Sequence, residues 1–532
     1  MSSELTGSGH LVRLILRRDR VQLPLWIIGV GGMIAVSALA VPGVYNTPEK
    51  VAGYAATVGA SPVSYLMSGR QAAIDTIGGI TANEISQVAQ LGVCLMVMFQ
   101  VVRHTRTEEE TGRAELLRST VLARHAATLA GLGYAVLTTL LLGSLTTVTM
   151  LSAGLEASGS IIYGAGLTLL GVCYAAVTLV AAQLSTSARG ALGIAGAAIA
   201  LGYLVRGLGA MQDNALVWLS PFGWAQLMNA FGDERWWPAI PLVAATAGLL
   251  ALAAYLNAHR DFGGGLVQPR RGDPRASRAL STSFGMALRL QRGTLIGWAV
   301  GLFLLALVYG AVIPTIPDLV KSNPDIGQYI GVSAGAEQAL IDAFLRYILL
   351  FMAVVSTGFA VSSVLRLRSE EESGRAEAVL ATGVSRTRWV TATVAVAGLG
   401  CLALMLLMGI GLAVGYGLGL GEWDQVAAQI AAQLAYLPAV LVVGGFAVAV
   451  AGLLPRYSML AWVLVAAVVF QTMLGETLRL PDVVDAISPF WHLPGVPVEP
   501  FDPVPGVVEL VLAASLVMLG LWGYRRRDMA TS

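Results

Sequence analysis

Two ten-residue stretches of this chain are near copies of each other: Arg106 to Glu115 reads RTEEETGRAE, and Arg368 to Glu377 reads RSEEESGRAE. Eight of the ten positions are identical, and the other two exchange Thr for Ser. The copies, called the acidic elements below, lie almost half of the 532-residue chain apart, and each follows a long apolar run. This spacing predicts two homologous halves that present the same element on the same side of a membrane.

The composition indicates the membrane. The chain is 56% apolar and 12% charged with a mean hydropathy of +0.71, whereas a soluble domain carries about 25% charged residues. Runs of about twenty apolar residues recur, enough to cross a hydrocarbon core of roughly 30 Å. We predict an all-α polytopic membrane protein with twelve transmembrane helices in two homologous six-helix halves. The predicted spans are residues 23–41, 85–102, 126–151, 161–184, 191–211 and 238–256, then 294–313, 344–365, 390–418, 426–453, 458–475 and 504–523.

Shorter landmarks support the same division. We expect a first half at residues 1–262, a cytoplasmic linker rich in Gly, Pro and Arg at 263–283, and a second half at 284–532. Each half begins with a basic amphipathic segment, Leu11–Arg20 or Phe284–Arg292, called the elbow segments below. Such a segment is either a helix in the membrane interface or an extension of the first span. Further repeats are Ser220-Pro221-Phe222 with Ser488-Pro489-Phe490, Arg260-Asp261 with Arg527-Asp528, and Trp26 with Trp298.

Charge sets the expected orientation. With both termini in the cytoplasm, most of the 33 Lys and Arg residues fall in cytoplasmic segments, which is the positive-inside pattern. We therefore predict a multi-pass protein of the plasma (inner) membrane whose two acidic elements face the cytoplasm. The chain lacks a basic stripe with interleaved aromatic residues, so we do not expect it to bind nucleic acid. The three cysteines lie in predicted spans, and the five histidines lack metal-ligand spacing, so we expect no metal site.

The acidic elements have the pattern of a helix start. Thr107 with Glu110, and Ser369 with Glu372, fit a capping box, and carboxylates in a first turn complement the helix dipole. We expect a short helix from there through residue 117 or 380. Gly112 and Gly374 would then lie inside a helix, which predicts close approach of another backbone.

A single acidic helix would be read as a solvated loop, but two near-identical copies favour docking of a partner protein. The predicted docking residues are Glu108, Glu109, Glu110, Gly112, Arg113, Glu115, Glu370, Glu371, Glu372, Gly374, Arg375 and Glu377.

These residues carry a resemblance. Glu110, Gly112, Glu115 and Arg124, with Glu372, Gly374, Glu377, Ser385 and Arg386, resemble the coupling-helix region of ATP-binding-cassette exporter permeases of the drug, antibiotic and polysaccharide class. A fused twelve-span chain is similar to the actinobacterial permeases of polyketide-antibiotic export, such as the tetronasin exporter. The resemblance implies a six-span unit with an interfacial elbow helix and a short external hairpin before the last span. It also implies export driven by ATP.

The chain lacks the glycine-rich phosphate loop with its following lysine, since Lys50 and Lys321 are its only lysines and neither follows such a loop. We therefore expect no enzyme activity and no cofactor in this chain. ATP and Mg²⁺ would bind a separate cytoplasmic ATPase, and two such similar docking elements fit a homodimer of it.

Two further predictions concern transport. Aligning the repeats without gaps sets Glu84 opposite Arg346, which predicts an extracellular gate between the halves; the alternative is a local pair of residues one helical turn apart, such as Asp342 with Arg346, at the membrane interface. Met96, Phe99, Met352 and Phe359 are candidates for an apolar substrate path, although ordinary packing also explains them.

Two other classes stay open at this point. A proton-coupled drug efflux transporter also has six plus six spans, but it would use a carboxylate near mid-span. A polytopic membrane glycosyltransferase would need clustered external acids. The favoured function is a permease that moves an amphipathic or apolar compound, such as an antibiotic, a drug or a lipid, out of the cell.

Overall fold

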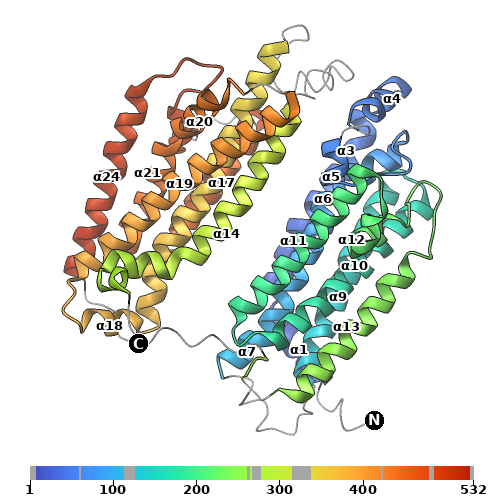
Figure 1. The fold of residues 1–532 in the computed structure, drawn as a ribbon, viewed down its shortest axis with the longest axis horizontal. Coiled ribbons are helices and arrows are strands. Elements are labelled where there is room, and N and C mark those ends of the chain that lie inside the picture. Colours follow the sequence, from blue (N-terminus) through green and yellow to red (C-terminus); the bar gives the residue numbers. More distant parts are fainter. Residues whose placement is uncertain are drawn as a thin grey trace. The chain divides into compact units, whose positions relative to one another are not determined.

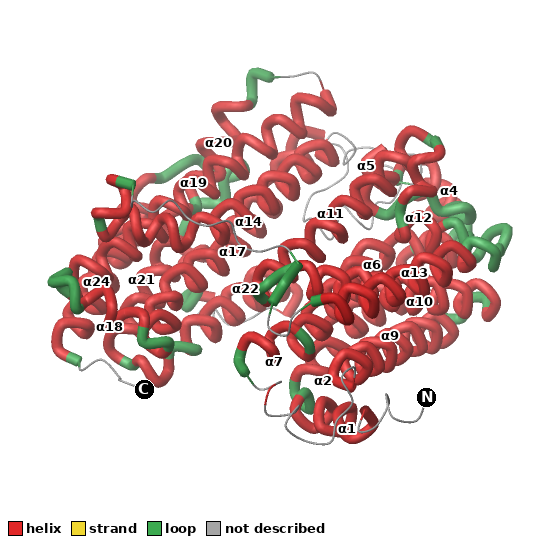
Figure 2. The backbone as a smooth tube through the Cα atoms, turned by 60° about the horizontal axis from the view of Figure 1, so that its bottom comes forward, coloured by secondary structure: helices red, strands yellow, loops and turns green. Residues whose placement is uncertain are grey.

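The computed structural model describes residues 8–58, 62–112, 115, 126–260, 264–266, 277–313, 337–420, 423–478 and 485–527. Every regular element in these residues is helical, as the backbone tube shows (Figure 2). The chain forms two compact units, Met1–Arg271 and Gly272–Ser532, called the first and second half below. Their boundary lies in the segment that the sequence analysis treats as a linker.

The described helices include eleven that are long and apolar enough to cross a membrane, and a shorter apolar helix at Leu460–Thr472. The predicted all-α polytopic fold is confirmed. Helices of the first half are α1 (Ser8–Arg18), α2 (Gln22–Trp26), a π-helical turn (Ile27–Gly31), α3 (Gly32–Val44), α4 (Pro48–Thr57), α5 (Pro62–Met67), α6 (Ile77–His104), α7 (Arg106–Glu110), α9 (Ala126–Ser152), α10 (Ala157–Leu184), α11 (Ala188–Gln212), η2 (Ala215–Leu219), α12 (Pro221–Gln226) and α13 (Ala239–His259).

Helices of the second half are η3 (Arg278–Ser281), α14 (Ser283–Val312), α17 (Glu337–Glu372), α18 (Arg375–Leu380), α19 (Arg386–Leu420), α20 (Val426–Ala435), α21 (Leu437–Leu453), η5 (Pro455–Tyr457), α22 (Leu460–Leu478), η6 (Pro489–His492) and α24 (Pro503–Arg526). Each half has its own apolar core, built around α6, α9 and α10 in the first half and around α14, α17, α19 and α21 in the second.

Local sequence explains where the long helices begin. Thr76 caps α6 by accepting a hydrogen bond from the Gly79 N–H at 3.0 Å. Thr282 caps α14 in the same way through the Gly285 N–H at 3.0 Å. Each cap satisfies a donor that a helix start leaves unpaired. These hydroxyls therefore set the helix starts within otherwise apolar sequence.

Glycines bring helices α14 and α19 together. A Cβ on Gly310 would lie 2.1 Å from the Leu412 carbonyl oxygen, and one on Gly415 would lie 2.0 Å from the Leu307 carbonyl oxygen. Only glycine tolerates this approach, which membrane helices use to gain packing contacts.

The repeated Ser-Pro-Phe motif begins a short helix in both halves. Ser220 caps α12 by accepting from the Phe222 N–H at 3.2 Å. Pro489 opens η6 in the second half. Phe222 and Phe490 are both buried in the cores. The motif therefore ties the segment before the last span to the core of each half.

The elbow segments differ between the halves. In the first half the segment forms the separate helix α1, which packs on the start of α9 through Leu11, Ala126 and Ala130. In the second half it forms the first turns of α14 and continues into the span. The second elbow segment is therefore an extension of the first span, whereas the first is a separate helix, whose place in the membrane interface stays a prediction.

Candidate functional site: the two acidic elements

In both acidic elements the hydroxyl residue of the predicted capping box, Thr107 or Ser369, lies inside a helix and is not its N-cap, so the predicted capping box is wrong. Helix α17 continues without a break through Glu372, and Ser369 lies inside it. In the first half α7 carries the three glutamates, and its first residue is Arg106 and not Glu108. The side-chain hydroxyls of Thr111 and Ser373 donate to the carbonyls four residues earlier, at 2.9 and 2.8 Å. The exchange of Thr111 for Ser373 between the copies therefore preserves a hydrogen bond.

Gly112 and Gly374 stop these helices. Their φ angles are +72° and +70°, in the left-handed region, and their N–H groups donate to the carbonyls of Glu109 and Glu371 at 3.2 and 3.0 Å. Left-handed backbone costs an L-residue about 1–2 kcal/mol, and glycine avoids this cost. Among the described residues, a Cβ at either position would meet nothing within 4 Å. The expected close approach of another backbone is therefore not found within this part of the chain, and the backbone conformation by itself explains the repeated glycine.

The middle glutamate of the first element is held by two arginines. Arg260, just after α13, donates from Nη1 to Glu109 Oε2 at 2.8 Å and from Nη2 to Glu109 Oε1. Arg106 Nη1 also donates to Glu109 Oε2, at 2.7 Å. All three side chains are largely buried. We call this set, and its counterpart below, the arginine–glutamate triads.

The second element repeats the triad. Arg527, just after α24, donates from Nη2 to both carboxylate oxygens of Glu371, at 2.5 and 2.8 Å. Arg368 Nη1 lies 3.7 Å from Glu371 Oε2. The Glu371 side chain is only 1% exposed. Figure 1 shows α7 near the end of α13, and α18 near the end of α24. Each triad therefore fixes the end of the second span to the end of the last span of its half.

The sequence had shown the Arg260 and Arg527 repeat but had not assigned it a role. A signal for this role was present in the sequence, because these arginines and the glutamates are duplicated together in otherwise divergent halves.

The sequence analysis also did not assign a role to Asp19. This residue is buried against His104, whose Nε2 lies 2.7 Å from Asp19 Oδ2, and Arg103 Nη2 lies 3.3 Å from Oδ1.

The flanking glutamates are arranged differently. Glu108 pairs with Arg18 of the elbow segment, whereas Glu370 pairs with Arg375 at 2.6 Å and Arg366 at 3.5 Å. The third glutamates, Glu110 and Glu372, are exposed, as are Glu115, Arg375 and Glu377. Glu110 Oε2 also accepts a hydrogen bond from the Ala188 N–H at the start of α11, at 2.9 Å. Arg113 and Arg124 lie outside the described residues. The exposed carboxylates are thus Glu110, Glu115, Glu372 and Glu377, while the middle glutamates point into the protein.

Two arginines at the second element have raised pKa values. The hydrogen bond that Arg375 donates to Glu370 raises the pKa of Arg375 above its ordinary value. Burial acts to lower the pKa of Arg527, but the hydrogen bond and charge of Glu371 outweigh it, and the pKa is raised. Both guanidinium groups therefore stay charged at physiological pH.

The predicted gate residues each have a partner within their own half. Glu84 accepts a hydrogen bond from the Tyr54 hydroxyl. Arg346 Nη1 lies 3.8 Å from Glu499 Oε1. A gate between Glu84 and Arg346 stays a prediction.

The four residues of the predicted path pack within their halves. Met96, Met352 and Phe359 are fully buried in the cores. Phe99 is 45% exposed and stacks on Trp26 at 6.0 Å between ring centroids. Phe359 makes an edge-to-face contact with Trp298, at 6.4 Å between ring centroids. Their role in a substrate path also stays a prediction.

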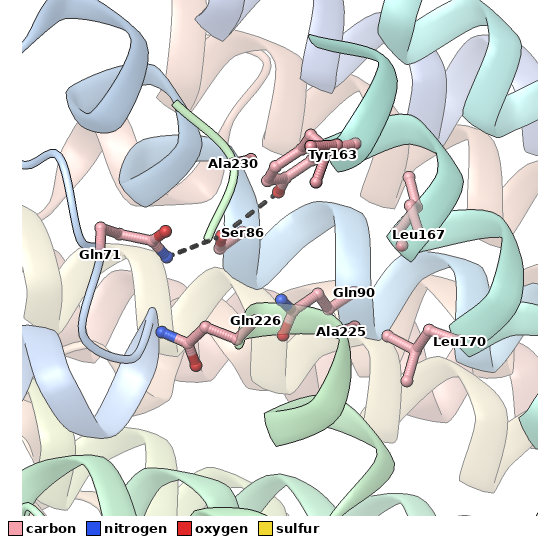
Figure 3. Close-up of a pocket in the computed structure, with 11 residues that line it drawn as sticks. Gln71, Ser86, Gln90, Tyr163, Leu167, Leu170, Ala225, Gln226 and Ala230 are labelled. Carbon is pink, nitrogen blue, oxygen red and sulfur yellow. Dashed lines mark hydrogen bonds between the residues drawn. The ribbon is translucent and has the colours of Figure 1, made fainter. Parts of the chain in front are cut away.

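A small polar cavity lies in the first half. Figure 3 shows Gln71, Ser86 and Tyr163 joined by hydrogen bonds at its edge, of 3.3 and 3.2 Å. Gln90 and Gln226 also line it. Its volume is about 20 Å³, which holds about one water molecule. The cavity is therefore too small for a drug-sized cargo.

The fold and the paired acidic elements define a polytopic membrane permease. The family model "Multidrug efflux system permease Rv1217c, C-terminal domain" matches residues 280–525. The multidrug efflux system permease protein Rv1217c of Mycobacterium tuberculosis is 35% identical over 533 aligned positions, which cover 99% of this chain and 96% of that relative. The chain belongs to this family of multidrug efflux permeases. The resemblance to exporter permeases is confirmed, and the secondary-transporter and glycosyltransferase alternatives are not favoured.

Proposed function

We propose that this chain is the membrane-spanning subunit of an exporter that a separate ATPase drives, and that it moves amphipathic or apolar compounds out of the cell. The observation that carries the proposal is the pair of acidic elements, which two equivalent triads hold in the same local geometry. A transporter that receives force at two equivalent points needs such a pair. The name of the Mycobacterium tuberculosis relative supports drug efflux as the activity.

The ATPase would dock on the exposed part of each element. Glu110, Glu115, Glu372 and Glu377 present carboxylates to solvent, whereas Glu109 and Glu371 hold each element to the last span. Because the elements are so alike, one kind of ATPase as a homodimer fits both. ATP and Mg²⁺ would bind that partner. The positive-inside pattern places the elements and both termini in the cytoplasm.

The test is charge reversal at the exposed positions alone. Glu110→Lys with Glu372→Lys should abolish permease-stimulated ATP hydrolysis and co-purification of the ATPase, because each change replaces attraction by repulsion at the interface. Each change removes one exposed contact, the hydrogen bond from the Ala188 N–H to Glu110 or the ion pair of Glu372 with Arg368, so each should cost only about 1 kcal/mol of stability, and the permease should stay folded. Glu156→Lys is the matched control, since Glu156 is an exposed carboxylate between α9 and α10 and should leave hydrolysis unchanged. Normal hydrolysis in the double variant would contradict the proposal.

One residue gives the proton-coupled alternative a direct test. Glu509 of α24 is 5% exposed, and neither carboxylate oxygen has a hydrogen-bond partner among the described residues. A carboxylate inside a span is costly and often functional. Glu509→Gln should leave ATP-driven efflux intact in vesicles; loss of efflux with retained ATP hydrolysis would instead favour proton coupling.

A further inference from the structure

The second half contains a cavity where the first half has ion pairs. Aligning Trp26 with Trp298 sets Arg18 opposite Leu290 and Asp19 opposite Gln291. Arg18 and Asp19 fasten the first elbow segment to Glu108 and His104. Their counterparts provide no charge, and Gln291 only accepts a hydrogen bond from Ser363. Leu290 and Gln291 instead line a cavity of about 580 Å³.

The walls of this cavity are amphipathic. They come from the elbow segment, the end of α17, α18 and the start of α19. Met286, Leu290, Leu367, Val379 and Trp389 supply apolar surface. The volume falls within the roughly 300–1,000 Å³ of small-molecule sites. The cavity therefore has room for part of an amphipathic molecule.

The charged groups on the walls are unbalanced. Arg366, Arg375 and Arg388 line the cavity together with one carboxylate, Glu370. Glu370 already pairs with Arg366 and Arg375. Arg388 is exposed and has no carboxylate partner among the described residues. The cavity is thus positively charged at one side and apolar elsewhere.

We propose that this cavity binds an anionic phospholipid of the cytoplasmic leaflet, with the phosphate at Arg388 and the acyl chains along the elbow segment. The occupant follows from charge complementarity and from the exposed apolar side chains in the first turns of α14, among them Phe284 and Leu288, which offer apolar surface to acyl chains where the span begins. Basic pockets on the cytoplasmic side bind lipid phosphates. The choice of the cytoplasmic leaflet rests on the proposed function, in which the acidic elements face the cytoplasm. Bound lipid would take the place of the first half's ion pairs and fasten the second elbow segment.

The test is native mass spectrometry of the purified permease, without ATPase, titrated with dioleoyl phosphatidylglycerol or dioleoyl phosphatidylcholine. The wild-type protein should retain phosphatidylglycerol preferentially. Arg388→Gln should weaken retention about fivefold, the effect of one arginine near an anionic lipid. Arg289→Gln is the matched control, because Arg289 is exposed on the same elbow segment but does not line the cavity; it should bind like wild type.

A second variant keeps the test decisive if Arg388→Gln folds poorly. Ala378→Trp fills the cavity from α18 without removing a charge and should abolish preferential retention. Glycerol 3-phosphate at millimolar concentration should not displace the lipid, since it lacks acyl chains; displacement would overturn the lipid proposal in favour of a free phosphate. Equal retention of the two lipids, or wild-type binding by both cavity variants, would also overturn it. Since no ATPase is present, failure of ATPase docking cannot produce these results.

Discussion

The first half fastens its elbow segment with buried charges, whereas the second half uses a neutral hydrogen bond beside a cavity. Asp19 pairs with Arg103 and His104 in the first half, and Gln291 accepts from Ser363 in the second. The triads, by contrast, are present in both. The two halves therefore share the parts that shape the acidic elements and differ in how their first spans are anchored. A symmetric function requires only the shared parts, which are the triads that shape the acidic elements.

The largest expected effects test what the halves share. Glu109→Ala and Glu371→Ala each leave buried arginine charge without its carboxylate, which costs about 3–5 kcal/mol when a buried pair loses one partner. Both variants should lower the thermal unfolding midpoint of the purified permease by similar amounts. A large loss in one variant with none in the other would show that the triads are not equivalent.

The next effect tests the difference between the elbow segments. Asp19→Ala removes hydrogen bonds to charged groups and should cost about 2–3 kcal/mol, whereas Gln291→Ala removes one neutral hydrogen bond and should cost about 1 kcal/mol. Denaturant unfolding in detergent measures both. Equal losses would remove the distinction between an ionic and a neutral anchor.

A smaller effect concerns the glycines that stop the helices. Gly112→Ala and Gly374→Ala should each cost about 1 kcal/mol, because alanine disfavours the left-handed backbone. The matched control is Gly248→Ala in α13, where a Cβ also meets nothing within 4 Å but φ is not positive. This control should be neutral or slightly stabilising, since alanine favours helix. Similar unfolding midpoints for all three variants would contradict the backbone explanation.

The smallest effect separates the third glutamate from the second. Glu372 is 61% exposed and pairs with Arg368 at 2.8 Å, and an exposed pair contributes about 0.2–1 kcal/mol. Glu372→Gln and Glu110→Gln should therefore leave the unfolding midpoint nearly unchanged. A loss as large as that of Glu371→Ala would place the third glutamates in the stabilising network and away from docking.

The sequence predicted the helices better than their ends. Long apolar runs specify spans, so the fold class was predictable. The end of the second half's second span was not: the prediction placed it at Leu365, but α17 continues to Glu372. Pairs one helical turn apart, Arg366 with Glu370 and Arg368 with Glu372, support the helix there.

The triads were beyond prediction for a different reason. The Thr-Glu-Glu-Glu pattern fits a helix start as well as a helix that is about to stop, and only the left-handed glycine decides between them. Arg260, the partner of Glu109, lies 151 residues further along the chain. A local sequence pattern cannot predict a contact between residues so far apart. The repeat of Arg260 and Arg527 was visible in the sequence, but the repeat alone did not identify the glutamates as their partners.

The same separation has a consequence for biosynthesis. Glu109 leaves the ribosome 151 residues before Arg260, and Glu371 leaves it 156 residues before Arg527. In each half the triad of the glutamate cannot form until the last helix has been synthesised and inserted. The acidic element is therefore completed only when the last helix of its half has been made. A chain that stops before Arg527 cannot assemble both triads, so the finished pair of elements marks a chain in which the last helix of each half has been synthesised and inserted.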